Sequence, residues 1–437
     1  MKKLTQQPYL LICFLFIASI FTACEKDNDN DNDVCENGLS GANCDIIEFT
    51  ASDDIQELLQ TALITIEDGQ TIYLKAGNYV FTSTLSIEGK KDVTIKGDGQ
   101  DQTILSFAGQ TAGAEALKAN NMEQFLMHDF KIEDSAGDAI KIKDSEGVSF
   151  INISTVWAGE ANEENGAYGL YPVSSSHVLI DNCYVRGASD AGIYVGQTEH
   201  VIVRNSTVEE NVAGIEIENC NYADVYNNTA TRNTGGVLIF DMPNLPLKNG
   251  VQCRVFDNNI YQNDYRNFAP EGNIVGSVPS GTGIMIMTSK EVEIFNNEIT
   301  NNNVMGVGIV SYLVLEFFDD NLSYDDVEYV PYVNEINIHN NTFSRTTTYP
   351  EFQNQIGTML QNLYAQGDMP DIIYDGIFNP DLADVENKGI CIAGNGDATF
   401  ANVDAENFFQ DQNYDMLPYS CSPDGLPVVT VNAPTIE

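Results

Sequence analysis

The chain has 437 residues, of which 43% are hydrophobic, and this is enough to build one large domain around a buried core. It carries 64 acidic residues against 20 lysines and arginines, a formal net charge of −44 at pH 7. A charge of this sign excludes nucleic acid and anionic membrane surfaces as partners, because both are repelled. Acidic polysaccharides are repelled too, unless a local basic patch or bound cations reverse the field.

Residues 1–23 indicate a signal peptide rather than part of the fold. Two lysines precede an apolar run over 9–21, which is too short to span a membrane stably. Residues 21–24, Phe-Thr-Ala-Cys, resemble the lipobox of bacterial lipoproteins. The resemblance implies cleavage before Cys24 and acylation of its sulfur and amine, and two or more acyl chains anchor a protein stably. An ordinary signal peptide is the alternative.

Residues 24–34 follow the predicted cleavage point and are rich in Asp and Asn. They cannot bury a core, so we interpret them as an acidic tether. They resemble the export signal that follows the acylated cysteine of surface-displayed lipoproteins. This resemblance implies a lipid anchor in the outer membrane with the protein facing the cell surface; a periplasm-facing anchor is the alternative.

Residues 35–45 resemble the last loop of an EGF-like module, with Cys35 and Cys44 at its ends and two glycines between them. The resemblance implies a disulfide between these cysteines, since glycines permit the tight turn and an oxidising compartment favours the bond. Cys391 and Cys421 are a second candidate pair. The remaining three cysteines are expected to be buried as small apolar residues: Cys183, Cys220 and Cys253.

The segment 55–66 has apolar residues at helical spacing, and we expect a helix that covers the open end of the domain. The first coil of a repeat is expected to start at Gly69. Residues 69–99 resemble the opening of pectate-lyase-like β-helices. After Asn407 the pattern fades, and 411–437 is predicted to be a tail that caps the opposite end.

A period of 22 to 23 residues governs the centre of the chain. Gly192, Gly214 and Gly236 each begin a short segment of alternating apolar residues, and they lie 22 residues apart. A second alternating segment, an Asn-rich turn and a third short segment complete each repeat. Alternation with period 2 makes every segment a strand with one buried side, and successive coils stack about 4.8 Å apart. Asparagine suits the turns because it tolerates left-handed backbone angles and can bond to the asparagine one coil up.

The predicted fold class is therefore all-β: a right-handed parallel β-helix over 46–410 with an N-terminal capping helix. Four insertions interrupt the repeat, at 157–167, 242–250, 264–281 and 311–331. Insertions into such a stack become loops over one face, and they often frame a binding site.

The residues that alternate with the apolar ones must point outward. They form two neighbouring columns: Tyr171, Tyr194, Glu216, Leu238 and Met285 in the first, and Val173, Gly196, Glu218, Phe240 and Met287 in the second. Lys141 and Lys143 take the corresponding places in an earlier coil. Aromatic rings pack on sugar rings and carboxylates accept hydrogen bonds from sugar hydroxyls, so this face is a candidate polysaccharide site.

The candidate catalytic residues are Tyr168, Tyr171, Lys141 and Glu216, and the candidate ligand-binding residues are Tyr194, Glu218, Asp190, Asp241 and Trp157. Glu216 and Glu218 lie two apart on one strand and can act as an acid–base pair. They can equally hold Ca²⁺ with Asp241 or Asp190. The alternative is an ordinary exposed sheet face, with its apolar members beneath the loops 242–250 and 264–281.

Residues 165–220 resemble a family of secreted tandem-repeat β-helix proteins of unassigned function, and the resemblance extends over about 55–407. Members are often encoded beside a c-type cytochrome-like protein, which implies an extracytoplasmic redox protein as partner. More distantly, residues 168–173 resemble the Tyr-Gly-x-Asp-Pro-His motif of mannuronan C5-epimerases. Here Tyr171 and Val173 stand at the Asp and His positions, and valine cannot transfer a proton. The match thus supports the fold and the location of the face, and argues against the epimerase reaction.

We interpret the chain as a lipid-anchored cell-surface protein that binds a polysaccharide or a protein partner. One alternative is a carbohydrate-active enzyme, a polysaccharide lyase or epimerase acting on uronate-type glycans. Such a lyase needs a base and a group that neutralises the uronate. The only cations expected near the face are Lys141, Lys143, Arg186 and Arg204. The other alternative is an accessory partner of an extracytoplasmic redox protein.

Overall fold

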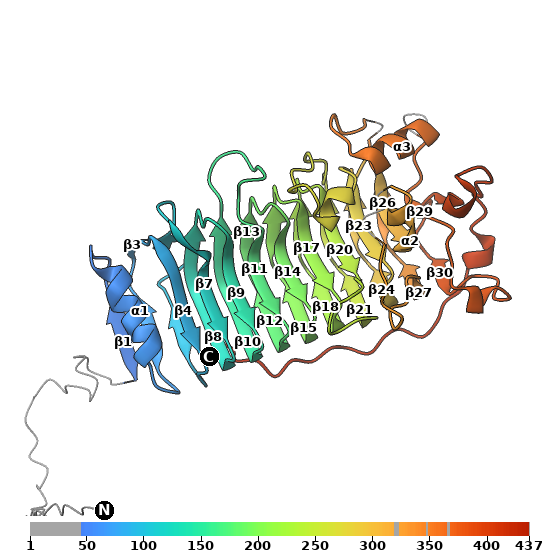
Figure 1. Cartoon of the computed structure of the whole chain (residues 1–437). Coiled ribbons are helices and arrows are strands. Elements are labelled where there is room, and N and C mark those ends of the chain that lie inside the picture. The colour runs from blue at the N-terminus through green and yellow to red at the C-terminus, as the bar shows by residue number, and fades with distance from the viewer. Residues whose placement is uncertain (1–44, 319–322, 347, 365–367, 437) are drawn as a thin grey trace, which may run out of the picture.

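The computed structural model describes residues 45–318, 323–346, 348–364 and 368–436, and these residues wind into a long stack of parallel coils (Figure 1). Two parallel sheets run along the stack, one of 20 and one of 11 strands in the described part of the chain. The signal peptide, the tether, Cys24, Cys35 and Cys44 lie outside the described residues. No helix among the described residues is long and apolar enough to cross a membrane.

The sheet that carries the candidate face has 11 strands: β4 (Ser83–Glu88), β7 (Ala112–Asn120), β9 (Asp138–Lys143), β11 (Tyr168–Val173), β14 (Ala191–Gly196), β17 (Ala213–Glu218), β20 (Gly235–Phe240), β23 (Thr282–Met287), β26 (Met305–Val310), β29 (Ile372–Tyr374) and β31 (Phe400–Asn402).

The second and third strands of each coil together form the 20-stranded sheet: β1 (Ile46–Phe49), β2 (Thr71–Leu74), β3 (Gly77–Val80), β5 (Thr94–Lys96), β6 (Thr103–Ser106), β8 (Glu123–Glu133), β10 (Glu146–Val156), β12 (Ser176–Asp181), β13 (Tyr184–Arg186), β15 (Glu199–Arg204), β16 (Thr207–Glu209), β18 (Asn221–Tyr226), β19 (Thr229–Thr231), β21 (Val251–Phe256), β22 (Asn259–Tyr261), β24 (Lys290–Phe295), β25 (Glu298–Thr300), β27 (Asn334–His339), β28 (Thr342–Ser344) and β30 (Ile390–Ala393).

The predicted repeat is confirmed by the register of the strands. Leu170 pairs with Ile193 and Ile193 with Ile215, so each coil stacks the same inward position on the last. These inward residues are fully buried and form a continuous apolar core along the axis. Two buried asparagine ladders follow the turns, and in one of them Asn228, Asn258 and Asn297 bond side chain to side chain at 3.0–3.1 Å. The ladders hold successive turns in register.

The capping helix is confirmed as α1 (Ile55–Thr65), whose Ile55, Leu59 and Leu63 are buried against the first coils. The expectation that the first coil starts at Gly69 is wrong. β1 already pairs in parallel with β2, so the stack begins before α1 and the helix is an insertion in the first coil. The remaining helices are short: α2 (Leu313–Glu316), α3 (Gln355–Leu363), and the 3₁₀ turns η1 (Ile274–Ser277), η3 (Pro380–Leu382), η4 (Ala405–Asn407) and η5 (Leu417–Tyr419).

The C-terminal tail differs from the predicted cap, because only its first part closes the end of the stack. There the Tyr419 ring packs on Phe400 at 4.9 Å, and the predicted bond between Cys391 and Cys421 is present. Residues 422–436, here called the strap, run back along the outer face of the 20-stranded sheet towards β10 and β8 (Figure 1). The tail therefore joins late coils to early ones.

The strap contacts a column of outward side chains that the sequence repeat alone would leave exposed. The backbone N–H of Leu426 donates to Glu293 at 3.0 Å and that of Val429 to Asp224 at 3.2 Å. Asp224 and Arg254, buried beside the strap, form an ion pair with Arg254 Nε 2.7 Å from Asp224 Oδ1. The strap thus completes a second buried layer outside the coil interior.

Cys183, Cys220 and Cys253 are free and buried, as expected. Burial raises the pKa of the Cys183 thiol to about 12, which keeps it protonated.

Candidate functional site

The outward column has the predicted order, and the register extends it by one residue at its N-terminal end. Lys118 pairs with Lys141 and Lys141 with Tyr171, while Tyr194 pairs with Glu216 and Glu216 with Leu238. Over successive coils the chemistry of this face therefore changes from basic to aromatic, then to acidic and finally to apolar.

The apolar end of the face is covered, as the alternative interpretation expected, but 311–331 and α3 contribute most of the cover besides 264–281, and 242–250 adds only the partly buried Met242. Leu238, Phe240, Met285 and Met287 are buried, and they form a second hydrophobic cluster with side chains of the insertions. The covering residues come from 264–281, from 311–331 and from α3: Phe268, Val275, Val278, Tyr312, Leu315, Tyr329 and Leu360. The insertions and α3 leave only a small apolar cavity of about 50 Å³ beside Met285 and Met287.

The basic end of the face is open. A groove of about 530 Å³ is lined by Lys118, Lys141, Lys143, Tyr171 and Pro246, together with polar side chains of neighbouring turns. We call it the basic groove. The Lys141 ammonium lies 4.4 Å from the centroid of the Tyr171 ring, a cation–π contact, and 3.8 Å from Asp138. Lys118 lies 3.8 Å from Glu115, so neither lysine is held in a close ion pair by these carboxylates.

Three tyrosines adjoin the groove. The ring centroid of Tyr168 lies 4.5 Å from that of Tyr171 and 4.6 Å from that of Tyr194. Tyr168 and Tyr171 are half-buried, whereas Tyr194 is only 5% exposed. Burial and the nearby carboxylates raise the pKa of Tyr171 to about 12, and they hold the pKa of Tyr168 and Tyr194 well above the usual value. A tyrosine base is therefore disfavoured at neutral pH.

Asp190, Glu216 and Glu218 lie next to the tyrosines, on the side away from the lysines. We call these three residues the carboxylate cluster. Glu216 is 2% exposed, and its Oε2 has no hydrogen-bond partner among the described residues. Asp190 Oδ2 accepts from the Asn273 amide at 2.7 Å, and Glu218 Oε1 accepts from the Tyr194 hydroxyl at 2.6 Å. In the described part of the chain no Lys, Arg or His lies within ion-pair distance of the three carboxyl groups.

Burial raises the pKa of all three carboxyl groups, and repulsion between them raises the pKa of Asp190 and Glu216 further. Burial, followed by the charge of Glu218, raises the pKa of Asp190 to about 7. Burial, followed by Asp190 and Glu218, raises the pKa of Glu216 well above its ordinary value. Burial also raises the pKa of Glu218, and the hydrogen bond from Tyr194 opposes the shift.

Four of the five predicted ligand-binding residues are buried: Tyr194, Asp190, Asp241 and Trp157. Asp241 is fully buried at the end of β20, and its carboxylate accepts no well-formed hydrogen bond from the described residues. Trp157, also named as a candidate ligand-binding residue, is covered in this structure. Its side chain is 4% exposed, and its indole N–H donates to the Ser135 carbonyl at 2.7 Å. The ring is buried because it fills the turn where the insertion 157–167 leaves the coil.

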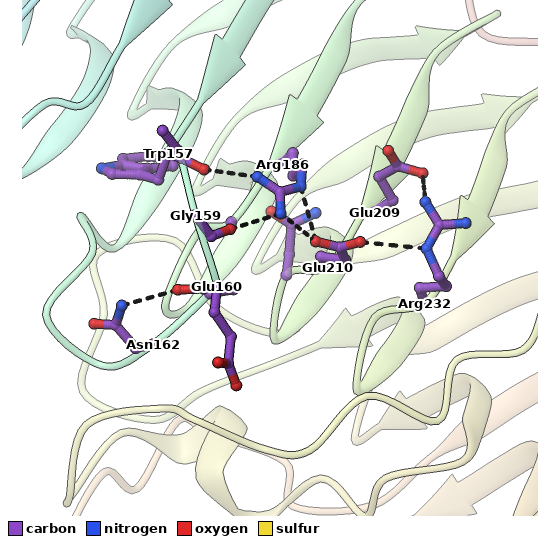
Figure 2. Close-up of polar contacts among 12 residues, drawn as sticks. Trp157, Gly159, Glu160, Asn162, Arg186, Glu209, Glu210 and Arg232 are labelled. Atoms are coloured by element: carbon purple, nitrogen blue, oxygen red, sulfur yellow. Dashed lines mark hydrogen bonds and ion pairs between the residues drawn. The ribbon is translucent and has the colours of Figure 1, made fainter.

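Hydrogen bonds of Arg186 and ion pairs of Arg186 and Arg232 stabilise the base of the insertion 157–167, as Figure 2 shows. Arg186 donates to the carbonyls of Trp157 and Gly159 at 2.9 and 2.7 Å and to Glu210 at 2.8 Å. Arg232 on the next coil bonds to the other oxygen of Glu210. At the tip, Arg266 of the insertion 264–281 donates to the Ala161 carbonyl at 3.1 Å. The two insertions therefore meet beside the carboxylate cluster.

Calcium binding by these carboxylates stays a prediction. Among the residues that the structure describes, no three His, Cys, Asp or Glu side chains are grouped so that they could hold a metal ion. The structure brings together most of the predicted site residues, and their individual roles stay predictions.

The sequence analysis did not identify two residues of the site, Lys118 and Asn273. Lys118 lies 23 residues before Lys141, so extending the period by one more coil would have found it. Asn273 lies in the insertion 264–281, where no repeat constrains its position.

Comparison with known proteins agrees with this architecture. A family model described as a right handed beta helix region matches residues 115–265 and 163–314. A mutant of DFA-IIIase from Arthrobacter chlorophenolicus A6, in complex with DFA-III, superposes with a TM-score of 0.50 at 13% identity, covering 88% of this chain and 91% of that one. The A-module of mannuronan C-5 epimerase AlgE6 from Azotobacter vinelandii gives 0.48 at 16% identity, covering 68% and 84%. No curated protein matches the chain significantly.

Proposed function

Because the chain is a right-handed parallel β-helix protein, of the pectate-lyase-like kind, we propose that it binds an anionic polysaccharide in the basic groove. The mature protein is proposed to be held at the outer membrane by a lipid on Cys24, facing the cell surface.

The observation that carries this proposal is the grouping of Lys118, Lys141 and Lys143 around one groove. In a chain with a net charge of −44, a polyanion is repelled from most of the surface. Here two adjacent strands, about 4.8 Å apart, present three lysines on the same face. Cations are thus gathered where a cavity is also available, although Lys143 lies 3.3 Å from Asp144, which lines the same groove.

The surroundings of the lysines suit a sugar chain. Tyr171 presents a half-buried ring beside Lys141, and a tyrosine ring can pack on a pyranose face. Asn120, Ser174 and Gln197 line the same groove and can bond to hydroxyl groups. The groove lies along the coil axis rather than inside the stack, so a long polymer can pass through it.

Binding to polygalacturonate and alginate, with neutral dextran as comparison, tests the proposal. We expect the chain without residues 1–24 to bind at least one of the two acidic polymers, with an affinity that falls as salt rises. Lys118→Ala and Lys141→Ala should each weaken binding about tenfold, the loss expected for one charged contact.

Lys96→Ala is the matched control. Lys96 also lies over a tyrosine ring, 4.8 Å from the centroid of Tyr73, and it belongs to the other sheet, outside the groove. Its substitution should leave the affinity unchanged. Equal binding of dextran, or equal losses in all three variants, would contradict the proposal.

A further inference from the structure

The carboxylate cluster differs from two buried acids of the opposite sheet. On the opposite sheet Asp224 is paired with Arg254, and Glu293 lies 3.0 Å from His339. Within the ranges that the structure describes, Asp190, Glu216 and Glu218 have no such cation, although burying a charged or unpartnered carboxyl group costs free energy. Unpaired acids of this kind are typical of catalytic sites.

The three acids do not have the same environment. Glu216 lacks a partner for Oε2, and a carboxyl oxygen that is buried and unpartnered favours the neutral, proton-carrying form. Asp190 accepts hydrogen bonds from the Asn273 amide and from the Tyr168 hydroxyl, and such donors favour the ionised form. Different environments of this kind separate a general acid from a general base.

From this geometry we propose that Glu216 and Asp190 are a catalytic acid and base that hydrolyse a glycosidic bond of the polysaccharide. The inference rests on the proposed function, because the substrate is the polymer held in the basic groove.

The step balances with water as the only co-reactant. Glu216 gives its proton to the glycosidic oxygen as the bond from that oxygen to the anomeric carbon breaks. Asp190 takes a proton from a water molecule, whose oxygen forms the new bond to the anomeric carbon. Each cleavage consumes one water and leaves two hydroxyl ends, and solvent returns the proton from Asp190 to Glu216. Glu218 is bonded to Tyr194, so it has a positioning role.

The distance from groove to cluster fits this assignment. Tyr171, Tyr194 and Glu216 occupy one column on three successive coils, so the acid lies two coil steps, roughly 10 Å, beyond the tyrosine of the groove. A polymer that extends along the axis from the lysines therefore passes the tyrosines and reaches the cluster.

Access requires the two insertions to separate, since Glu216 is almost fully covered. Their contact depends on Arg266, which donates to the Ala161 carbonyl and lies 3.3 Å from the exposed Glu160. The same insertion carries Asn273 to Asp190. Opening it would uncover the cluster, and we expect Arg266→Ala to raise the rate of cleavage.

The experiment measures new reducing ends on the acidic polymer that binds best, with the chain lacking residues 1–24. Reaction in ¹⁸O-labelled water should place one label on each cleaved bond, and no product should absorb near 232 nm as an unsaturated uronate does. Glu216→Gln and Asp190→Asn should each lower the rate about 100-fold or more while binding persists. Glu199→Gln, an exposed acid on the opposite sheet, is the matched control and should leave the rate unchanged.

Different outcomes would contradict the catalytic assignment and the proposed binding function. Binding without cleavage, in both the wild type and Arg266→Ala, overturns the catalytic assignment and leaves the binding proposal standing. Unsaturated products also overturn it, because they show elimination rather than hydrolysis. Absence of binding to every acidic polymer overturns the proposed function itself. Circular dichroism of the variants separates loss of folding from loss of a catalytic group.

Discussion

The hydroxyl of Tyr194 donates a 2.6 Å hydrogen bond to Glu218 on the following coil, and its ring reaches that position by crossing Gly196. A Cβ atom at Gly196 would lie 2.5 Å from the tyrosine hydroxyl and from one ring carbon. The glycine therefore makes room for a contact that ties the tyrosines to the carboxylate cluster.

Gly196→Ala should displace the Tyr194 ring and break this bond. We expect a loss of about 1–3 kcal/mol in the free energy of unfolding, the usual effect of overfilling a packed site. Denaturant titration measures the loss. Tyr194→Phe removes the hydroxyl alone and serves as comparison, and an alanine variant as stable as the wild type would show that the ring can move without cost.

Asp241→Asn should stabilise the protein at neutral pH. Burial, followed by the charge of Glu218, raises the pKa of Asp241 to about 8, so the folded form keeps a proton that the unfolded form releases near pH 4. The unfavourable contribution is absent below pH 4, grows as pH rises to about 8 and is constant above it. The gain from asparagine, about 1–3 kcal/mol, should therefore be larger at pH 8 than at pH 5. Melting temperatures at the two pH values check the sign, and a gain that is independent of pH would contradict the burial of a titrating acid.

Deleting residues 422–437 should destabilise coils that are distant in sequence. The strap contacts Glu293, Asp224, Ser149 and Gln124, and its removal breaks at least four hydrogen bonds, each contributing about 0.5–1.5 kcal/mol. Hydrogen exchange should show faster amide exchange in β10 and β18. Because the disulfide between Cys391 and Cys421 remains in this variant, unchanged protection would mean that the strap lies on the sheet without stabilising it.

Asn258→Ala should break one asparagine ladder in the middle. The Asn258 side chain bonds to Asn297 and accepts from Asn228, and all three are buried. The substitution also removes the side chain that accepts from the Asn228 backbone N–H and donates to the Val225 carbonyl, so we expect about 2–4 kcal/mol of destabilisation. Asn205→Ala, which changes an exposed turn residue, is the comparison, and a similar effect in both variants would argue against the ladder as a source of stability.

The register of the face could be predicted because every coil places the same position in the same column. Gly192, Gly214 and Gly236 fix the spacing, and from it follow the alignment of Tyr194 with Glu216 and the inward side of each strand. Such information is local and repeats along the chain, so a single sequence contains it several times.

Burial of that face could not be predicted, because it depends on segments outside the repeat. Leu238 and Met285 read as outward residues and are buried by insertions from distant coils. The strap reaches Asp224 across more than 200 residues, and Asn273 reaches Asp190 across 83. No periodicity constrains these contacts, and each depends on packing that appears only in three dimensions.

The strap connects parts of the chain that are made at different times. Residues 422–436 are translated after residues 124–293, yet they lie across the strands that those residues form. The early coils therefore keep one side uncovered until this much later segment folds onto them. The last residues of the chain complete the packing of strands that precede them by 133 to 308 residues.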